Sequence, residues 1–212
     1  MTLSAGPGQP AQSAAAPYAR VARMRLRGTV ETRLPAASRD CRLGLVTVPF
    51  PEPTAPAPSR AEVFLRYLDF FRSRLVDKLE GLPPGELRKS QVPSGWTPIE
   101  LIKHLTCTER RWLEWRFAGR DVGDPWADIR DDRWYVPPQE TLGDLVAALR
   151  AQARRTRVLV ESRDLDEIGA PGPGWDEPAS LERVLFHMLQ EYARHVGQLD
   201  VVSELAGGPV GE

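Results

Sequence analysis

Cysteine, histidine, net charge and long apolar runs are all scarce in this chain of 212 residues. Its two cysteines, Cys41 and Cys107, cannot form a disulfide framework, so the sequence indicates a reducing compartment, the cytoplasm. No apolar run approaches the roughly 18 residues that a membrane-spanning helix needs, which excludes an integral membrane protein. The formal net charge of −1 offers no basic surface for nucleic acid. With 42% hydrophobic and 27% charged residues, the composition is that of a soluble globular protein.

The first part of the chain differs in composition from the rest. Residues 1–60 contain eight arginines, three acidic residues and nine of the twenty prolines. Such a segment cannot bury enough apolar surface to offset chain entropy, so we expect residues 1–58 to be a disordered extension. A transit peptide or secretory signal fits poorly, because the segment lacks an amphipathic face and an apolar stretch of about 7–15 residues. A start assigned too far upstream is the favoured explanation, with Met24 or Val46 as the true start.

From Ser59 onward, apolar residues recur about every 3.6 residues, as in amphipathic helices. The pattern predicts four helices, over residues 60–82, 98–118, 141–162 and 180–206. Ser59 can cap the first helix, and Thr97 with Glu100 can form a capping box at the second. No segment within 60–212 shows convincing strand alternation. Four helices with one apolar stripe each must bury these stripes together, so we expect an all-α four-helix bundle over residues 59–208.

The three histidines are the strongest candidates for chemistry. His104 falls on the second predicted helix, and His187 and His195 fall on the fourth. Glu191 and His195 lie four residues apart, so they share one helix face at a spacing of about 6 Å along the axis. On helical wheels, His195 faces the bundle interior, Glu191 lies at its edge, and His187 is furthest outside. His104 lies on the flank of its own apolar stripe and can approach the pair across the bundle.

Two interpretations of this pattern are open. Side chains one turn apart can bind a single ion, because Zn–N and Zn–O bonds are about 2.0–2.2 Å long. With His104 as the third ligand, an open fourth position would remain, as in catalytic zinc sites. Alternatively, each histidine is a surface or packing residue, and Glu191 with His195 is a plain ion pair.

Other side chains are secondary candidates. The connections between the helices are long for a bundle and carry aromatic residues that either cover a pocket or form small accessory cores, namely Trp126, Trp134, Tyr135 and Trp175. Arg111 lies on the His104 side of its helix and is a candidate contact for an anionic cosubstrate. Cys107 is expected to be a packing residue and not a nucleophile.

Several strings of this sequence together resemble the DinB-like superfamily of metal-binding four-helix bundles. Within it, they resemble the mycothiol-dependent branch of mycothiol S-transferases and maleylpyruvate isomerases. The strings are TVPFPEP at 47–53, GWTPIELIKHL at 95–105, ERRW at 109–112, SL at 180–181 and HMLQEYARHVGQLD at 187–200. The resemblance covers roughly residues 46–206, and nothing upstream of Val46 matches.

The resemblance implies a specific metal site. In this superfamily a histidine on the second helix and two residues four apart on the last helix bind a divalent metal, commonly zinc. The implied ligands are therefore His104, Glu191 and His195, where Glu191 replaces a histidine that many members carry. His187 is a neighbour or an alternative ligand, and no catalytic residue is implied beyond the metal site. Nickel or another divalent ion is an alternative to zinc.

The resemblance also implies a reaction. Relatives attach low-molecular-weight thiols such as mycothiol to electrophilic small molecules, and a metal-bound thiol is deprotonated and strongly nucleophilic. Two alternatives stay open: thiol-dependent isomerisation or metal-dependent hydrolysis at the same site, and a non-catalytic, stress-related metal-binding bundle. The expected partners are a small-molecule thiol and an electrophile, without nucleic acid or membrane. A homodimer is the commonest default assembly.

Overall fold

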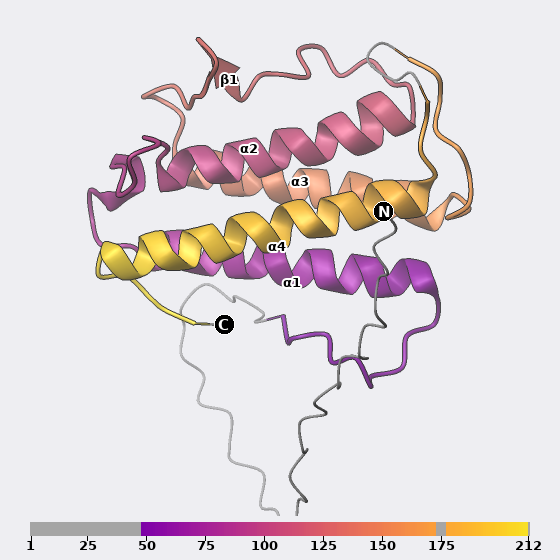
Figure 1. Cartoon of the computed structure of the whole chain (residues 1–212), viewed down its shortest axis with the longest axis horizontal. Helices are drawn as coiled ribbons and strands as arrows, with labels where there is room; N and C mark the ends of the chain where they lie inside the picture. The colour runs from indigo at the N-terminus through magenta and orange to yellow at the C-terminus, as the bar shows by residue number, and fades with distance from the viewer. Residues whose placement is uncertain (1–47, 173–176, 212) are drawn as a thin grey trace, which may run out of the picture. The chain divides into compact units, whose positions relative to one another are not determined.

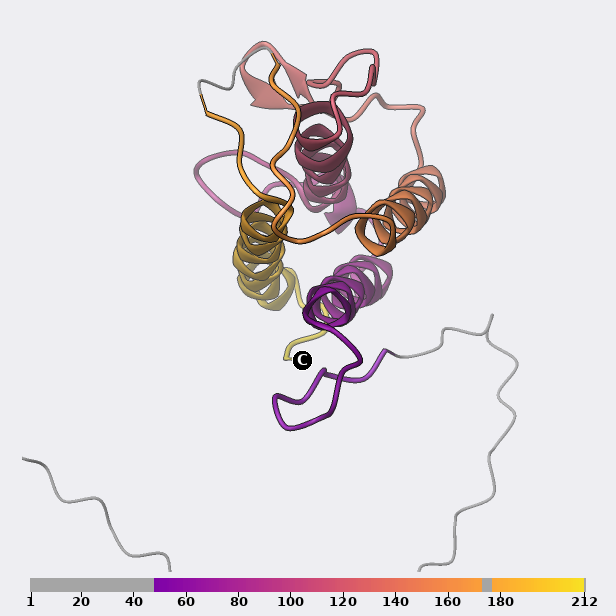
Figure 2. The same ribbon diagram turned by 90° about the vertical axis from the view of Figure 1, so that its right-hand side faces the viewer.

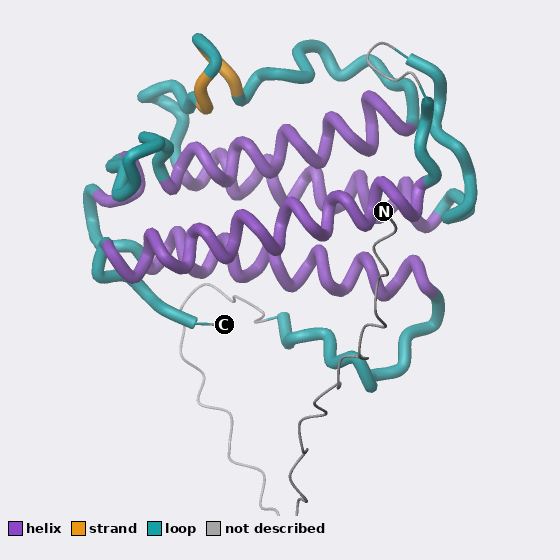
Figure 3. The backbone as a smooth tube through the Cα atoms, viewed as in Figure 1, coloured by secondary structure: helices purple, strands orange, loops and turns teal. Residues whose placement is uncertain are grey.

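Four long helices dominate the structure, a computed structural model that describes residues 48–172 and 177–211. The long helices are α1 (Arg60–Gly81), α2 (Pro98–Arg110) with its continuation η2 (Arg111–Phe117), α3 (Leu142–Glu161) and α4 (Leu181–Leu205). The smaller elements are η1 (Glu86–Arg88), β1 (Ile129–Arg130) and β2 (Arg133–Trp134). Figure 3 shows that the strands form only a small part of the fold. The predicted all-α four-helix bundle is therefore confirmed.

The helices form a bundle in which each one has two close neighbours. α1 packs against α3 and α4, and α2 packs against the same two helices from the other side. α1 and α4 run in one direction, and α2 and α3 run in the other (Figure 1). Viewed along their axes, the four helices occupy the corners of a quadrilateral (Figure 2). The parallel arrangement of α2 and α3 explains their long connection, because the chain must return along the bundle between them.

Side chains at the helix ends fix where the helices begin. The hydroxyl of Ser59 accepts a hydrogen bond of 3.1 Å from the backbone N–H of Glu62 at the start of α1. At α2, the Glu100 carboxylate accepts a bond of 2.8 Å from the backbone N–H of Thr97. The observed helix ends therefore agree closely with those predicted from capping residues.

Apolar side chains from all four helices fill the centre of the bundle. Leu68, Leu101, Leu149 and Leu185, one from each helix, are at most 1% exposed. Burying a leucine side chain contributes about 1.5–3 kcal/mol, so these stripes hold the helices together. None of the helices within the described residues has the length and apolar character needed to cross a bilayer.

Two features differ from the sequence prediction. The second predicted helix changes at Arg111 into seven residues of wider π-helix, a feature that is frequent at functional sites. The sequence shows no convincing strand alternation within 60–212, and the structure adds one short antiparallel hairpin, formed by β1 and β2. Strands of two residues are too short to show alternation. The turn residues Asp131 and Asp132 have φ of 51° and 59°, values that two-residue hairpins favour and that Asp tolerates.

The segment before α1 is partly within the described residues. Phe50 packs edge-on against Tyr67 and Phe70 of α1, with ring centroids 5.9 and 5.2 Å apart. Most of the predicted extension, including Met24, Cys41 and Val46, lies outside the described residues. Trp175 also lies outside them.

Candidate metal centre

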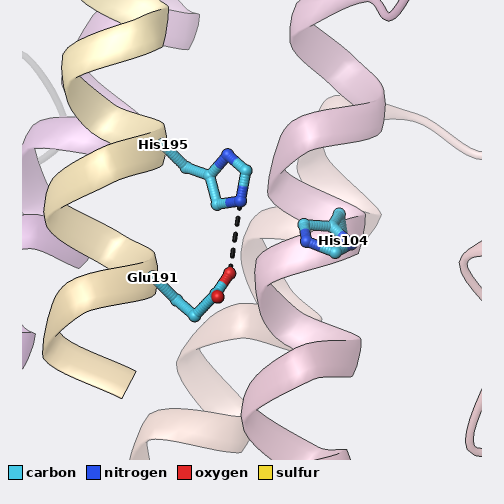
Figure 4. Close-up of side chains that lie close together, drawn as sticks. All are labelled: His104, Glu191 and His195. Carbon is cyan, nitrogen blue, oxygen red and sulfur yellow. Dashed lines mark ion pairs between the residues drawn. The ribbon is translucent and has the colours of Figure 1, made fainter. Parts of the chain in front are cut away.

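His104, Glu191 and His195 come together between α2 and α4. Their potential ligand atoms all lie within 4.8 Å of one another. Nε2 of His195 is 3.3 Å from Oε2 of Glu191, and two ligands of one tetrahedral ion are roughly 3.4 Å apart. Figure 4 shows Glu191 and His195 projecting from successive turns of α4 towards the helix that carries His104. The structure thus brings the three predicted side chains together, and their binding of a metal stays a prediction.

The imidazole of His104 is oriented by a buried carboxylate. Nδ1 of His104 lies 2.9 Å from Oδ2 of Asp128, and Nη2 of Arg111 donates to Oδ1 over 2.7 Å. Burial opposes ionisation of Asp128, but the His104 hydrogen bond and the Arg111 charge lower its pKa below the usual value. An ionised carboxylate can only accept, so Nδ1 of His104 carries the proton. In the neutral imidazole, the lone pair that a metal ligand requires is then on Nε2, which lies 3.4 Å from the Thr108 hydroxyl.

The second imidazole is oriented in the same way. Nδ1 of His195 donates to Oε1 of Gln198 over 2.8 Å, which directs Nε2 towards Glu191. A hydrogen bond from His195 lowers the pKa of Glu191, and this outweighs the opposing effect of burial. When Nε2 of His195 carries no proton, it and the carboxylate oxygen 3.3 Å away are both acceptors that one shared cation would satisfy. A proton can fill this role, and a divalent metal can replace it.

An aromatic wall from the hairpin covers the site. The Trp134 ring stacks on His104 with centroids 4.1 Å apart and planes inclined by 21°. The same ring meets His195 edge-on at 5.4 Å. The side chains of His195, His104 and Glu191 are 11%, 13% and 23% exposed. The site is therefore largely shielded from bulk water.

The other candidates from the sequence have different roles. His187 lies outside the group of three. Its ring packs against Trp112, with ring centroids 4.4 Å apart, and its Nε2 is 3.7 Å from Oε1 of Glu191. The expected contact of Arg111 with an anionic cosubstrate is not supported. Its guanidinium pairs with Asp128, donates to a loop carbonyl over 3.0 Å and stacks on Trp126.

The sequence prediction missed two residues that orient the site, Asp128 and Gln198. Gln198 follows His195 by three residues on α4, so helical spacing alone could have suggested the contact. Asp128 lies in the long connection after η2, and its position depends on the tertiary structure. The only available signal was that Arg111 and His104 lie on one side of the same helix, where an acidic partner would satisfy both.

Replacing Asp128 by asparagine is expected to weaken metal binding about 10–100-fold. An amide has only one acceptor oxygen, so it cannot accept from Arg111 and His104 as the two carboxylate oxygens do. Competition titration against a chromogenic chelator would measure the affinity. Asp121→Asn, an exposed position in the same connection, is the matched control. If the Asp128→Asn protein bound metal as tightly as the control, Asp128 would not be needed to orient His104 for metal binding.

Cys107 has the properties of a packing residue. Its side chain is 7% exposed, and burial, with a smaller effect of the Asp128 charge, raises the pKa of its thiol to about 11. In a Cys41→Ser background at pH 8, we expect iodoacetamide to alkylate the folded protein at least about 100-fold more slowly than the guanidinium-unfolded protein. Similar rates would show that Cys107 is reactive. The expected result means that the protein supplies no thiol nucleophile from this position.

A family model described as mycothiol S-transferase matches residues 63–208, which run from the first turn of α1 to just beyond α4. No curated protein matches the chain.

Proposed function

Because the chain belongs to the mycothiol S-transferase family, as its sequence motifs predicted, we propose a specific metal-dependent reaction for it. The protein joins the sulfur of a low-molecular-weight thiol, such as mycothiol, to an electrophilic small molecule. The metal is held by His104, Glu191 and His195. The observation that carries the proposal is that three possible ligand atoms lie within 4.8 Å of one another, with Nδ1 of both imidazoles already bonded elsewhere.

These residues fit a divalent metal in number and kind. Two imidazole nitrogens and one carboxylate oxygen suit zinc, and nickel and other divalent ions accept the same donors. Three protein ligands leave room for one more, as in catalytic sites. When bound, the metal supplies the positive charge that makes a thiol a thiolate near neutral pH.

The surrounding side chains define what the protein contributes. Asp128 and Gln198 hold the two imidazoles in one tautomer and orientation, so little reorganisation is needed when ligands bind. Trp134 covers the site and limits the access of water that would compete with sulfur. In a substitution, the thiol proton is released to solvent, a sulfur–carbon bond forms, and the leaving group departs with the electron pair of the broken bond.

The test is a panel of thiols with one reporter electrophile and mass detection of the products. We expect a thiol conjugate whose formation stops on chelation and resumes when zinc is restored. Isomerisation would leave the electrophile's mass unchanged, and hydrolysis would exchange its leaving group for hydroxyl without incorporating the thiol. Conjugation no faster with the metal-loaded protein than without it would overturn the proposal.

A further inference from the structure

A cavity of about 690 Å³ lies beside the candidate metal centre. Trp134 lines this cavity and also stacks on His104, so the two sites share one aromatic wall. Glu100 lines it as well, and this residue precedes His104 by four positions on α2. Residues four apart lie on one helix face about 6 Å apart along the axis. The cavity therefore begins about one helical turn from the metal ligands.

The cavity wall combines balanced charges with aromatic rings. Its charged side chains are the acids Glu100, Asp131 and Asp132 and the bases Arg130 and Arg133, and its rings are Trp96, Trp134 and Tyr135. A strongly anionic ligand would face three carboxylates, and an apolar ligand would desolvate charges without replacing their hydrogen bonds. Hydroxyl groups can donate to the carboxylates and accept from the guanidiniums, while aromatic faces pack on saturated rings. The wall chemistry favours a neutral, polyhydroxylated ligand.

Two local features hold this wall in place. Gly95 has φ of 83°, and a Cβ at this position would lie 2.3 Å from Nη2 of Arg133. Only glycine lets the guanidinium lie this close to the chain. This close approach of Arg133 links the segment before α2 to the hairpin. The neighbouring turn carries Asp131 and Asp132 in the left-handed region, where a side chain is tolerated at some cost.

We propose that this cavity binds the polyhydroxylated part of the thiol cosubstrate, an inference that rests on the proposed transferase function. Mycothiol carries its cysteinyl group on a neutral sugar–inositol unit, which matches the wall chemistry. With that unit in the cavity, the cysteinyl arm spans about one helical turn to reach the space between His104 and His195. Trp134 forms the boundary between the two parts of the ligand.

The test uses a double variant that removes carboxylates without disturbing the hairpin. Asp131→Asn combined with Asp132→Gly creates an Asn-Gly turn, the preferred sequence for a two-residue hairpin with positive φ at both positions. The matched control is Glu161→Gln combined with Glu204→Gln, which makes the same charge change at exposed positions of α3 and α4. Trp134 is left intact because it contacts the metal centre.

The measurement compares mycothiol with N-acetylcysteine, which has the same thiol but lacks the sugar–inositol unit, with one aryl halide as electrophile. The hairpin variant is expected to lower kcat/KM for mycothiol about 5–10-fold through KM, as loss of one or two hydrogen bonds would. The kcat/KM of the hairpin variant for N-acetylcysteine is expected to stay unchanged. The control variant is expected to keep the wild-type kcat/KM for both thiols. Equal losses with both thiols, or no loss with mycothiol, would overturn the proposal.

A binding measurement separates this proposal from the proposed function. N-acetylglucosaminyl-inositol, which is neutral and contains no sulfur, is expected to bind the wild-type protein in calorimetry and to bind the hairpin variant more weakly. Binding without metal-dependent conjugation of any thiol would retain the cavity site and reject the transferase function. Conjugation of mycothiol without binding of N-acetylglucosaminyl-inositol would reject the cavity site and retain the transferase function.

Discussion

The His195→Ala variant is expected to lose its bound metal and, with it, conjugating activity by about 1000-fold or more. Structural zinc sites with four ligands bind with roughly 10–16 kcal/mol, so each ligand is worth several kcal/mol. Removing His195 also leaves the Glu191 carboxylate without the partner that lies 3.3 Å away. Elemental analysis after dialysis should show a stoichiometry near one for the wild-type protein and near zero for the variant.

His187→Ala is the matched control for this prediction, because it removes an imidazole from the same helix. His187 lies outside the group of three and packs against Trp112, so this variant should keep a stoichiometry near one. Circular dichroism would show that both variants remain helical. A His195→Ala protein that retains its metal, or a His187→Ala protein that loses it, would mean that the ligand set is wrong.

The helices and the arrangement of the site residues could be predicted because both depend on local sequence patterns. Capping acts within one turn: the Ser59 hydroxyl caps α1 as predicted, and the Glu100 carboxylate accepts from the backbone N–H of Thr97 as a capping box requires. Glu191 and His195 lie on one face because helical spacing requires it. Once four amphipathic helices must pack together, the inward direction of His195 follows from the apolar stripe of α4.

What the sequence could not predict depends on contacts between distant segments. Asp128 reaches His104 from a position 24 residues later, in a connection with no periodic pattern. The hairpin that places Trp134 on His104 has strands of only two residues, so it leaves no alternation to detect. Arg111 was placed on the correct side of its helix, but the acidic partner that occupies it could not be identified.

A second polar cluster lies in the bundle core, and the sequence analysis did not find it. Glu109 of α2 is fully buried and accepts from one residue of each other helix. Arg72 of α1 donates to both carboxylate oxygens, over 2.6 and 3.2 Å. Tyr192 of α4 donates over 2.6 Å, and Thr156 of α3 donates to Oε1. Burial would lower the pKa of Arg72, but the Glu109 charge raises it above the ordinary value, so the pair is ionic.

The exposed ion pair between Arg163 and Glu167 is the control against which the stability contribution of this cluster can be compared. These two residues are four apart and 2.6 Å from each other, and both side chains are at least one-third exposed. Exposed pairs are worth about 0–1 kcal/mol, so Glu167→Gln should leave the free energy of unfolding nearly unchanged. Any larger loss in the core cluster then reflects burial and not the formal loss of one ion pair.

Glu109→Gln is expected to lower the free energy of unfolding by about 3–5 kcal/mol, because the Arg72 cation then stays buried without its counter-ion. Urea unfolding in the presence of chelator would measure this loss without a contribution from bound metal. Combining Glu109→Leu with Arg72→Met removes both charges, and this double variant should recover most of the stability, since apolar replacements of buried ion pairs are often neutral. A single variant as stable as Glu167→Gln would show that the pair contributes little. A double variant less stable than Glu109→Gln would instead mean that the hydroxyl groups of Thr156 and Tyr192 depend on the carboxylate for hydrogen bonding.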